Sequence, residues 1–190
     1  MQLGVFVYGT DQYVIDGVNI SNNTINSAST GIYMRYAGKG TVSGNTCTRN
    51  NNSSGGKFLV DAYKFLSCND LDVLNNSVKG NGNLFDNGMA LRGNSRNIKL
   101  TGNIIESAGK HGIGVYEGSV AVITGNSIRA SGQHGITVMD QSSANMDGNS
   151  ILSSVVNGIT VLGSDAAINN NTVSGSGQTG ISVQNQSSIS

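Results

Sequence analysis

One feature of the sequence constrains its fold more than any other: a motif that recurs along the whole chain at nearly constant spacing. A run of the form Ile-Thr-Gly-Asn-Ser-Ile is followed, after a polar stretch, by Gly-Ile-x-Val. The Asn of this motif stands at Asn23, Asn45, Asn76, Asn103, Asn126, Asn149 and Asn171, with spacings of 22, 31, 27, 23, 23 and 22 residues. The Gly stands at Gly31, Gly88, Gly112, Gly135, Gly158 and Gly180, and Lys57 takes its place in one repeat. Two anchors in one register predict about seven similar units.

Apolar residues alternate around both anchors, as they do in strands with one inward face. Ile123 and Ile128 flank Asn126, for example, and Ile136 and Val138 follow the next Gly anchor. Each unit is therefore predicted to hold three short strands, and their recurrence in the same order excludes hairpins. The consistent solution is a coil in which each strand pairs in parallel with its counterpart one turn later, about 4.8 Å away.

The recurring Asn has a physical reason. A tight turn between strands needs a residue that tolerates left-handed backbone angles, and Asn does so. Stacked Asn side chains can also hydrogen-bond along the axis as ladders. We therefore expect the seven Asn residues to form one column at one corner of the coil.

These runs resemble the right-handed parallel β-helix repeat of the pectin-lyase-like superfamily, from about Val14 to Val183. The resemblance implies an all-β fold: a right-handed, single-stranded parallel β-helix of about 7–8 coils, with 22–23 residues and three short strands in each. We expect residues 1–190 to form a single domain, as a fragment of a longer chain that lacks the end caps of the fold. The superfamily includes polysaccharide lyases, hydrolases, epimerases, phage tailspikes and non-catalytic modules, so the fold leaves the chemistry open.

Composition and resemblance together define the expected partners. The 11 basic and 11 acidic residues cancel, so no overall field favours nucleic acid or an anionic membrane. No stretch approaches the ~20 apolar residues of a membrane-spanning helix. The resemblance implies a polysaccharide partner and an extracellular or virion-associated protein, although the chain shows no signal peptide, and it allows a homotrimer. It also allows Ca²⁺ as a cofactor, whereas two His residues and the lack of a Cys-x-x-Cys motif predict no metal site.

Departures from the regular repeat indicate where a functional surface lies. Extra residues fall in segments 49–56 and 80–87, and a longer stretch after Lys57 falls within 61–68. All three flank the strand that begins at the Gly anchor. Loops that lengthen around one sheet build the walls of a cleft, and function concentrates in such loops.

The same register brings charged side chains together. It places Arg35, Asp61 and Arg92 on consecutive rungs, with Asp61 between two guanidinium groups. This cluster is either a surface ion ladder worth well under ~1 kcal/mol per exposed pair, or the floor of a saccharide cleft in which Arg pairs with a sugar carboxylate. The candidate catalytic residues are Asp61, Asp86, Arg92, His111 and Tyr116, and the candidate substrate-binding residues are Tyr33, Arg35, Tyr63 and Lys64.

An enzyme that acts on an acidic polysaccharide would use these residues in one of two ways. A lyase needs a cation for the uronate carboxylate, a base for the C5 proton and an acid for the leaving oxygen. The candidates for these roles, in that order, are Arg35 or Arg92, Lys64 or His111, and Tyr116 or Tyr63. A hydrolase instead needs two carboxylates, and the candidate pair is Asp61 with Asp86.

The alternative function is a non-catalytic structural or adhesive β-helix, such as a phage tailspike or tail-fibre shaft. The later coils favour it, because they are short and regular. They carry Thr137, Thr160 and Ser182 where a catalytic sheet would show charge.

His111 and His134 directly precede their Gly anchors and are expected to stack one rung apart. The turns Lys110-His-Gly-Ile113 and Gln133-His-Gly-Ile136 resemble the His-Gly-Phe/Ile turns of alginate-epimerase-like coils. The chain contains no proline, so it lacks the Asp-Pro-His-Glu catalytic motif of those enzymes. A stacked His without an acid partner also fits a structural role.

Overall fold

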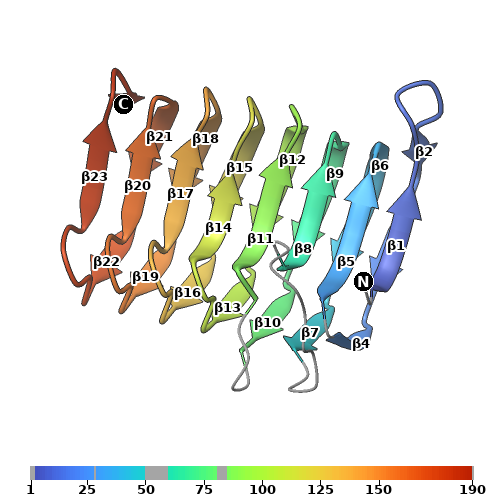
Figure 1. Ribbon diagram of the computed structural model, residues 1–190, viewed down its shortest axis with the longest axis horizontal. Coiled ribbons are helices and arrows are strands. Elements are labelled where there is room, and N and C mark those ends of the chain that lie inside the picture. Colours follow the sequence, from blue (N-terminus) through green and yellow to red (C-terminus); the bar gives the residue numbers. More distant parts are fainter. Residues whose placement is uncertain (1–2, 28, 50–59, 81–84, 190) are drawn as a thin grey trace.

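The computed structural model describes residues 3–27, 29–49, 60–80 and 85–189. Within these ranges the chain forms strands and turns and no helix, so no described segment is a candidate membrane-spanning helix. It winds into a coil of about seven turns, and each turn adds one strand to each of three parallel sheets (Figure 1). The predicted all-β parallel β-helix is confirmed.

The eight-stranded sheet contains the strand that follows each Gly anchor. Along the coil its strands are β1 (Leu3–Tyr8), β5 (Thr30–Arg35), β8 (Asp61–Leu66), β11 (Asn87–Arg92), β14 (His111–Val115), β17 (Ile136–Met139), β20 (Ile159–Leu162) and β23 (Ile181–Gln184).

The nine-stranded sheet comes next in each coil. Its strands are β2 (Ile15–Asp16), β6 (Ala37–Ser43), β9 (Asn69–Leu74), β12 (Arg96–Thr101), β15 (Val120–Thr124), β18 (Ser143–Asp147), β21 (Asp165–Asn169) and β24 (Ser188–Ile189), and β3 (Asn19–Ser21) also pairs with β6.

The seven-stranded sheet completes the coil. Its strands are β4 (Thr24–Ser27), β7 (Thr46–Arg49), β10 (Ser77–Lys79), β13 (Ile104–Glu106), β16 (Ser127–Arg129), β19 (Ser150–Leu152) and β22 (Thr172–Ser174).

The core is a set of apolar columns inside the coil. Ile113, Ile136 and Ile159 pair in register on neighbouring strands and are fully buried. Buried Val, Leu, Met and Ala side chains stack in the same way beneath the other two sheets. Because inward-facing residues alternate along the strands of all three sheets, the two-residue period of the sequence is sufficient to build the core.

The predicted Asn column is confirmed and links the coils at the corner between the nine- and seven-stranded sheets. The Oδ1 of Asn126 accepts hydrogen bonds from the backbone N–H of Asn103 (2.9 Å) and from its side-chain amide (3.0 Å). The Nδ2 of Asn126 in turn donates to Asn149 Oδ1 and to the carbonyl of Leu100, both at 2.9 Å. The same amide-to-amide contact runs from Asn23 to Asn171.

A second polar ladder occupies the turn between the eight- and nine-stranded sheets. The backbone N–H of Ser95 donates to Ser119 Oγ at 3.2 Å, and that of Ser142 donates to Ser164 Oγ at 3.1 Å. Ser164 N–H continues to Ser187 Oγ at 3.2 Å. This column was not predicted from the sequence, although its Ser residues follow the Gly anchor at a nearly constant distance.

The third coil has a different register from the one predicted. Ile32 of β5 pairs with Tyr63 of β8, so Ala62, and not Lys57, takes the place of the Gly anchor. Lys57 lies outside the described residues. From Ala62 to Asn76 the coil then has the ordinary length, so the expected second insertion within 61–68 is wrong: this segment begins with strand β8 itself.

The new register also corrects the predicted charge ladder. Leu66 of β8 lies between Arg35 and Arg92 on consecutive rungs, so Asp61 is not sandwiched by the two guanidinium groups. Asp61 pairs instead with Asn87 at the start of the strand. The extra residues of this coil all precede β8. Residues 50–56 of segment 49–56 and residues 81–84 of segment 80–87 lie outside the described residues.

We predict that Asn126→Ala lowers the free energy of unfolding by about 2–4 kcal/mol, because it leaves several buried donors and acceptors unpaired. Urea denaturation of both proteins measures the loss. The matched control is Asn145→Ala on the exposed face of β18, which should stay within about 0.5 kcal/mol of the parent. Equal losses in both variants would contradict the ladder's role in stability.

Candidate functional site

The outer face of the eight-stranded sheet changes in character along the coil. Its first five strands carry aromatic and cationic side chains, and its last three carry small polar, aliphatic and amide side chains. From β1 to β23 the two outward positions are Phe6 and Tyr8, Tyr33 and Arg35, Lys64 and Leu66, Ala90 and Arg92, Gly114 and Tyr116, Thr137 and Met139, Thr160 and Leu162, and Ser182 and Gln184.

Cations and aromatic rings contact each other at the N-terminal end of this face. The guanidinium carbon of Arg35 lies 5.3 Å from the ring centre of Tyr8 and 5.2 Å from that of Tyr36. The ammonium of Lys64 lies 5.3 Å from the ring centre of Tyr33. These cation–π contacts hold positive charge beside flat apolar surfaces.

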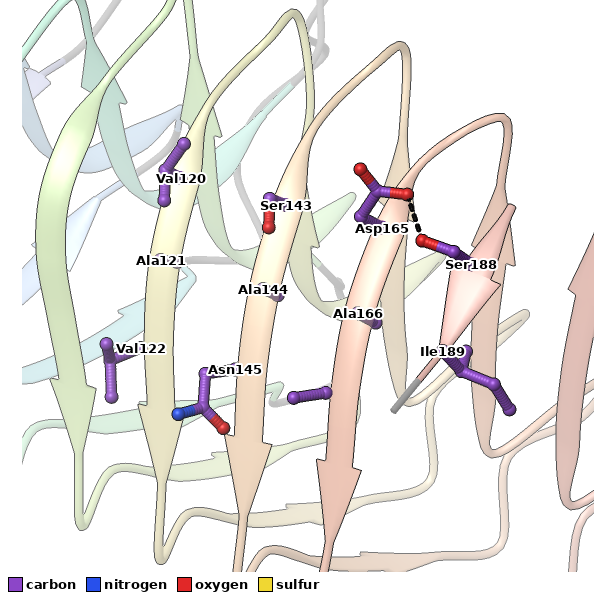
Figure 2. A pocket seen from close by; sticks show the side chains of 11 residues that line it. Val120, Ala121, Val122, Ser143, Ala144, Asn145, Asp165, Ala166, Ser188 and Ile189 are labelled. Atoms are coloured by element: carbon purple, nitrogen blue, oxygen red, sulfur yellow. Dashed lines mark hydrogen bonds between the residues drawn. The ribbon is translucent and has the colours of Figure 1, made fainter. Parts of the chain in front are cut away.

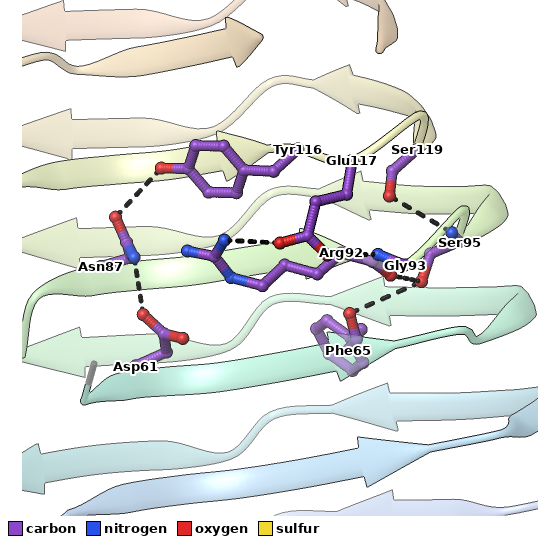
Figure 3. A network of polar contacts seen from close by, with 9 residues as sticks. All are labelled: Asp61, Phe65, Asn87, Arg92, Gly93, Ser95, Tyr116, Glu117 and Ser119. Carbon is purple, nitrogen blue, oxygen red and sulfur yellow. Dashed lines mark hydrogen bonds and ion pairs between the residues drawn. The ribbon is translucent and has the colours of Figure 1, made fainter. Parts of the chain in front are cut away.

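Three side chains on neighbouring strands form a chain of hydrogen bonds (Figure 3). The Nδ2 of Asn87 donates to Asp61 Oδ1 at 2.6 Å, and the hydroxyl of Tyr116 donates to Asn87 Oδ1 at 3.2 Å. All three side chains are buried. The other carboxyl oxygen of Asp61, Oδ2, has no hydrogen-bond partner among the described residues. The chain therefore ends at a buried carboxyl oxygen with an unused lone pair.

Arg92 lies against this chain of hydrogen bonds. Its guanidinium carbon is 4.3 Å from the ring centre of Tyr116. Its Nη1 is 3.1 Å from Glu117 Oε1, and the other oxygen of Glu117 accepts the backbone N–H of Gly93 (Figure 3). Glu117 thus fixes the position of the Arg92 guanidinium, which is 15% exposed and leaves its Nε without a partner among the described side chains.

Burial changes the proton affinity of the acids in this cluster. It raises the pKa of Asp61, although the hydrogen bond from Asn87 and the charges of Arg92 and Lys64 oppose the shift. Burial also raises the pKa of the Tyr116 hydroxyl, against the opposing effect of Arg92. Tyr116 is therefore a protonated donor at neutral pH, and Asp61 keeps its proton to a higher pH than an exposed Asp.

The expected stacking of the two histidines is confirmed. The rings of His111 and His134 lie 5.1 Å apart at an interplanar angle of 2°. Burial lowers the pKa of His111 to about 4, and the charges of His134, Lys110 and Arg92 add to this effect. Burial also lowers the pKa of His134. His111 is therefore unprotonated at neutral pH, and its ring centre is 6.4 Å from that of Tyr116.

One of the predicted site residues, Tyr63, is placed differently. Tyr63 points into the core, is fully buried and donates its hydroxyl to the carbonyl of Asn45 at 3.0 Å. Its predicted role as a surface binding residue or proton donor is therefore wrong, since the register of the third coil turns it inward. Asp86 lies at the edge of the cluster and forms an ion pair with Lys110 at 3.5 Å.

The other seven predicted site residues, Tyr33, Arg35, Asp61, Lys64, Arg92, His111 and Tyr116, lie on or beside the outer face of β5 to β14. Three further residues of the site, Asn87, Glu117 and Gly114, were not predicted from the sequence. Asn87 had a visible signal, because it precedes its Gly anchor as His111 and His134 do. Glu117 and Gly114 gave no comparable signal, since their contacts depend on the direction of the Tyr116 and Arg92 side chains.

A hollow of about 560 Å³ lies elsewhere, on the nine-stranded sheet (Figure 2). Small and aliphatic side chains of β15, β18 and β21 line most of it. Its single ionisable residue is Asp165, which accepts a hydrogen bond from Ser188. This hollow offers no set of acid, base and cation, so the chemistry favours the outer face of the eight-stranded sheet as the site.

The described residues offer little to a metal ion. No group of three or more His, Cys, Asp or Glu side chains among them lies close enough to hold one. Hard cations such as Ca²⁺ need six to eight oxygen ligands, so these residues do not fit the Ca²⁺ that the resemblance allowed.

Comparisons with known proteins agree with the fold. The family model for the right handed beta helix region matches residues 1–168. The periplasmic alginate epimerase AlgG superposes with a TM-score of 0.66 at 17% identity, over 99% of this chain and 47% of that one. The catalytic unit of a GH87 α-1,3-glucanase from Streptomyces thermodiastaticus superposes with a TM-score of 0.64 at 16% identity, over 99% and 43%. The chain thus spans less than half of either protein. No curated protein sequence gives a significant match.

The lowered pKa of His111 predicts acid sensitivity. As pH falls from about 6.5, the unfolded chain binds this proton before the folded chain does. Stability is therefore lost progressively down to the folded pKa of about 4. We predict that His111→Asn, which copies Asn87 and Asn157 in the same column, reduces that loss by roughly 1–3 kcal/mol.

Urea denaturation of parent and variant between pH 4 and 7 measures the two slopes. Gln133→Asn, at an exposed position of the same corner, is the control and should keep the parent's slope. Parallel curves for His111→Asn and the parent would show that His111 titrates normally.

Proposed function

Because this chain belongs to the right-handed β-helix family, whose stacked coils expose long sheet faces, we propose that it acts on an acidic polysaccharide at the outer face of β5 to β14. The observation that carries the proposal is the arrangement of Arg92, Tyr116 and His111. They lie on two neighbouring rungs, and burial keeps the Tyr116 hydroxyl protonated and the His111 imidazole unprotonated at neutral pH, as a β-elimination requires.

Each group has a role in this elimination. The guanidinium of Arg92 pairs with the uronate carboxylate and so acidifies the adjacent C5–H bond. The unprotonated imidazole of His111 accepts the C5 proton, and the electron pair forms the C4=C5 double bond as the C4–O bond breaks. Tyr116 gives its proton to the leaving oxygen. The products are an unsaturated uronate end and a free hydroxyl end.

The neighbouring residues could bind the sugar units on either side of the reacting one. Tyr33, Arg35 and Lys64 lie on the adjacent rungs, where rings can pack against sugar faces and cations can meet further carboxylates. Hydrolysis is supported less well, because Asp86, the partner carboxylate for Asp61, is held by Lys110. The structural neighbours that act on alginate and on α-1,3-glucan support a carbohydrate substrate, and the periplasmic location of the epimerase supports action outside the cytoplasm.

A second candidate is a rigid binding module. The regular coils from β17 onward favour it, because their outer positions carry no charge: Thr137 and Met139, then Thr160 and Leu162. In this alternative the protein binds a polysaccharide but does not catalyse a reaction on it. A homotrimer and association with a virion stay predictions of the sequence.

We predict that the protein releases unsaturated uronate products from polygalacturonate or alginate and none from neutral glucans. Arg92→Ala and Tyr116→Phe should each lower kcat/KM by about 100-fold or more, because each removes a group that acts in the transition state. Ultraviolet absorbance of the unsaturated product follows the reaction, and thermal melting checks the fold.

The matched control is Arg129→Ala on the seven-stranded sheet, which also removes an Arg–Glu pair, at 2.9 Å. It should keep full activity. New reducing ends without unsaturation would indicate hydrolysis, and binding without any product would indicate the module. Equal losses for Arg92→Ala and Arg129→Ala would contradict the placement of the site.

A further inference from the structure

The β14 coil departs from the two coils that follow it at two outward positions at once. The strands β14, β17 and β20 read Gly-Ile-Gly-Val-Tyr116, Gly-Ile-Thr-Val-Met139 and Gly-Ile-Thr-Val-Leu162. Gly114 therefore replaces Thr, and Tyr116 replaces an aliphatic side chain. Gly in a strand interior weakens the strand and often marks a close approach by another group.

The geometry explains why the two departures occur together. A Cβ atom on Gly114 would lie 2.1 Å from the hydroxyl oxygen of Tyr116 and 2.2 Å from its ring. The ring therefore lies across the backbone of Gly114, in space that Thr fills in the next coils. In this position the hydroxyl reaches Asn87, 29 residues earlier in the sequence. The absence of a side chain at Gly114 therefore makes room for the Tyr116 ring.

Asn87 connects Asp61 and Tyr116 through hydrogen bonds to both side chains. Its amide has a donor end on Asp61 and an acceptor end on Tyr116. An amide can reverse its two ends by rotation, whereas an ionised carboxylate can only accept hydrogen bonds and a protonated one can donate. A proton on Asp61 Oδ1, the oxygen that faces Asn87, therefore requires the amide to reverse its direction.

We propose that Asn87 is a positioning residue that couples the proton on Asp61 to the direction of the Tyr116 hydroxyl. With Asp61 ionised, Asn87 Nδ2 donates to the carboxylate and the Tyr116 hydroxyl donates to Asn87 Oδ1, as observed. With Asp61 protonated on Oδ1, the acid donates to Asn87 Oδ1, the reversed Nδ2 donates to Tyr116, and the Tyr116 O–H is released to donate to a ligand. A role for the released Tyr116 hydroxyl in the elimination rests on the proposed function. The coupling between Asp61 and Tyr116 does not depend on it.

The surrounding charges determine where the coupling titrates. Asp61 faces Lys64 of its own strand, Arg92 of β11 and Asp86. Tyr116 faces Arg92, Asp61 and Asp140, and His111 stands beside it. Burial opposes ionisation of Asp61, so its protonated form persists to a higher pH than that of an exposed Asp.

Nuclear magnetic resonance of the ¹³C-labelled whole chain tests the proposal without any substrate. We expect the Asp61 Cγ and Tyr116 Cζ signals to change with one common midpoint as pH is varied, while Tyr116 stays un-ionised. In Asn87→Leu, the Tyr116 signal should no longer follow Asp61, and the Asp61 midpoint should rise by ~0.5–1 pH unit because the carboxylate loses a donor.

Two further variants separate the coupling from other causes. Asp61→Asn should remove the Tyr116 response. Gly114→Ala keeps both Asp61 and Asn87 but displaces the ring, so Asp61 should still titrate while Tyr116 stops responding, even if Asn87→Leu fails to fold. The pair Gly114→Thr with Tyr116→Met copies the β17 coil and should preserve the melting temperature. A Tyr116 response that persists in Gly114→Ala or Asn87→Leu, or is missing from the parent, would overturn the proposal.

Discussion

The buried amide ladder of Asn residues is the interaction on which the rest of the structure depends. An unpaired amide inside the coil would cost more than its hydrogen bonds return, so each Asn is tolerated only when the coils on both sides present an Asn in register. This requirement fixes the rung-to-rung register from Asn23 to Asn171. Once the register is fixed, the inward apolar columns and the outward functional columns follow from the two-residue period of the strands.

The sequence was sufficient to predict the parallel coil, the Asn corner and the stacked histidines, because each repeats in an unbroken register. It was not sufficient where a repeat has no Gly anchor. Alternation alone allowed either Lys57 or Ala62 to begin the third strand of the eight-stranded sheet, and the first choice turned Tyr63 outward and moved Asp61 onto the Arg rung. Pairing with both β5 and β11 decides between them, and that information is absent from the local sequence.

The contacts that organise the candidate site were harder to predict for a different reason. Glu117, Arg92 and Tyr116 interact through the directions of long side chains, and these directions depend on which neighbours are small. Gly114 gave no sign of its role until the position of the Tyr116 ring was known. In a repeat protein, a site therefore becomes visible as a pair of simultaneous departures from the repeat, more clearly than as a conventional motif.

The Asn ladder also has a direction. Each side-chain amide from Asn23 to Asn149 donates to the Asn of the next coil, and each from Asn45 to Asn171 accepts from the Asn of the previous one. Their dipoles therefore align and polarise one another along the axis, as peptide groups do in an α-helix. The column carries a partial negative potential towards β4 and a partial positive one towards β22, so the two ends of the coil are electrostatically unequal even though the net charge of the chain is zero.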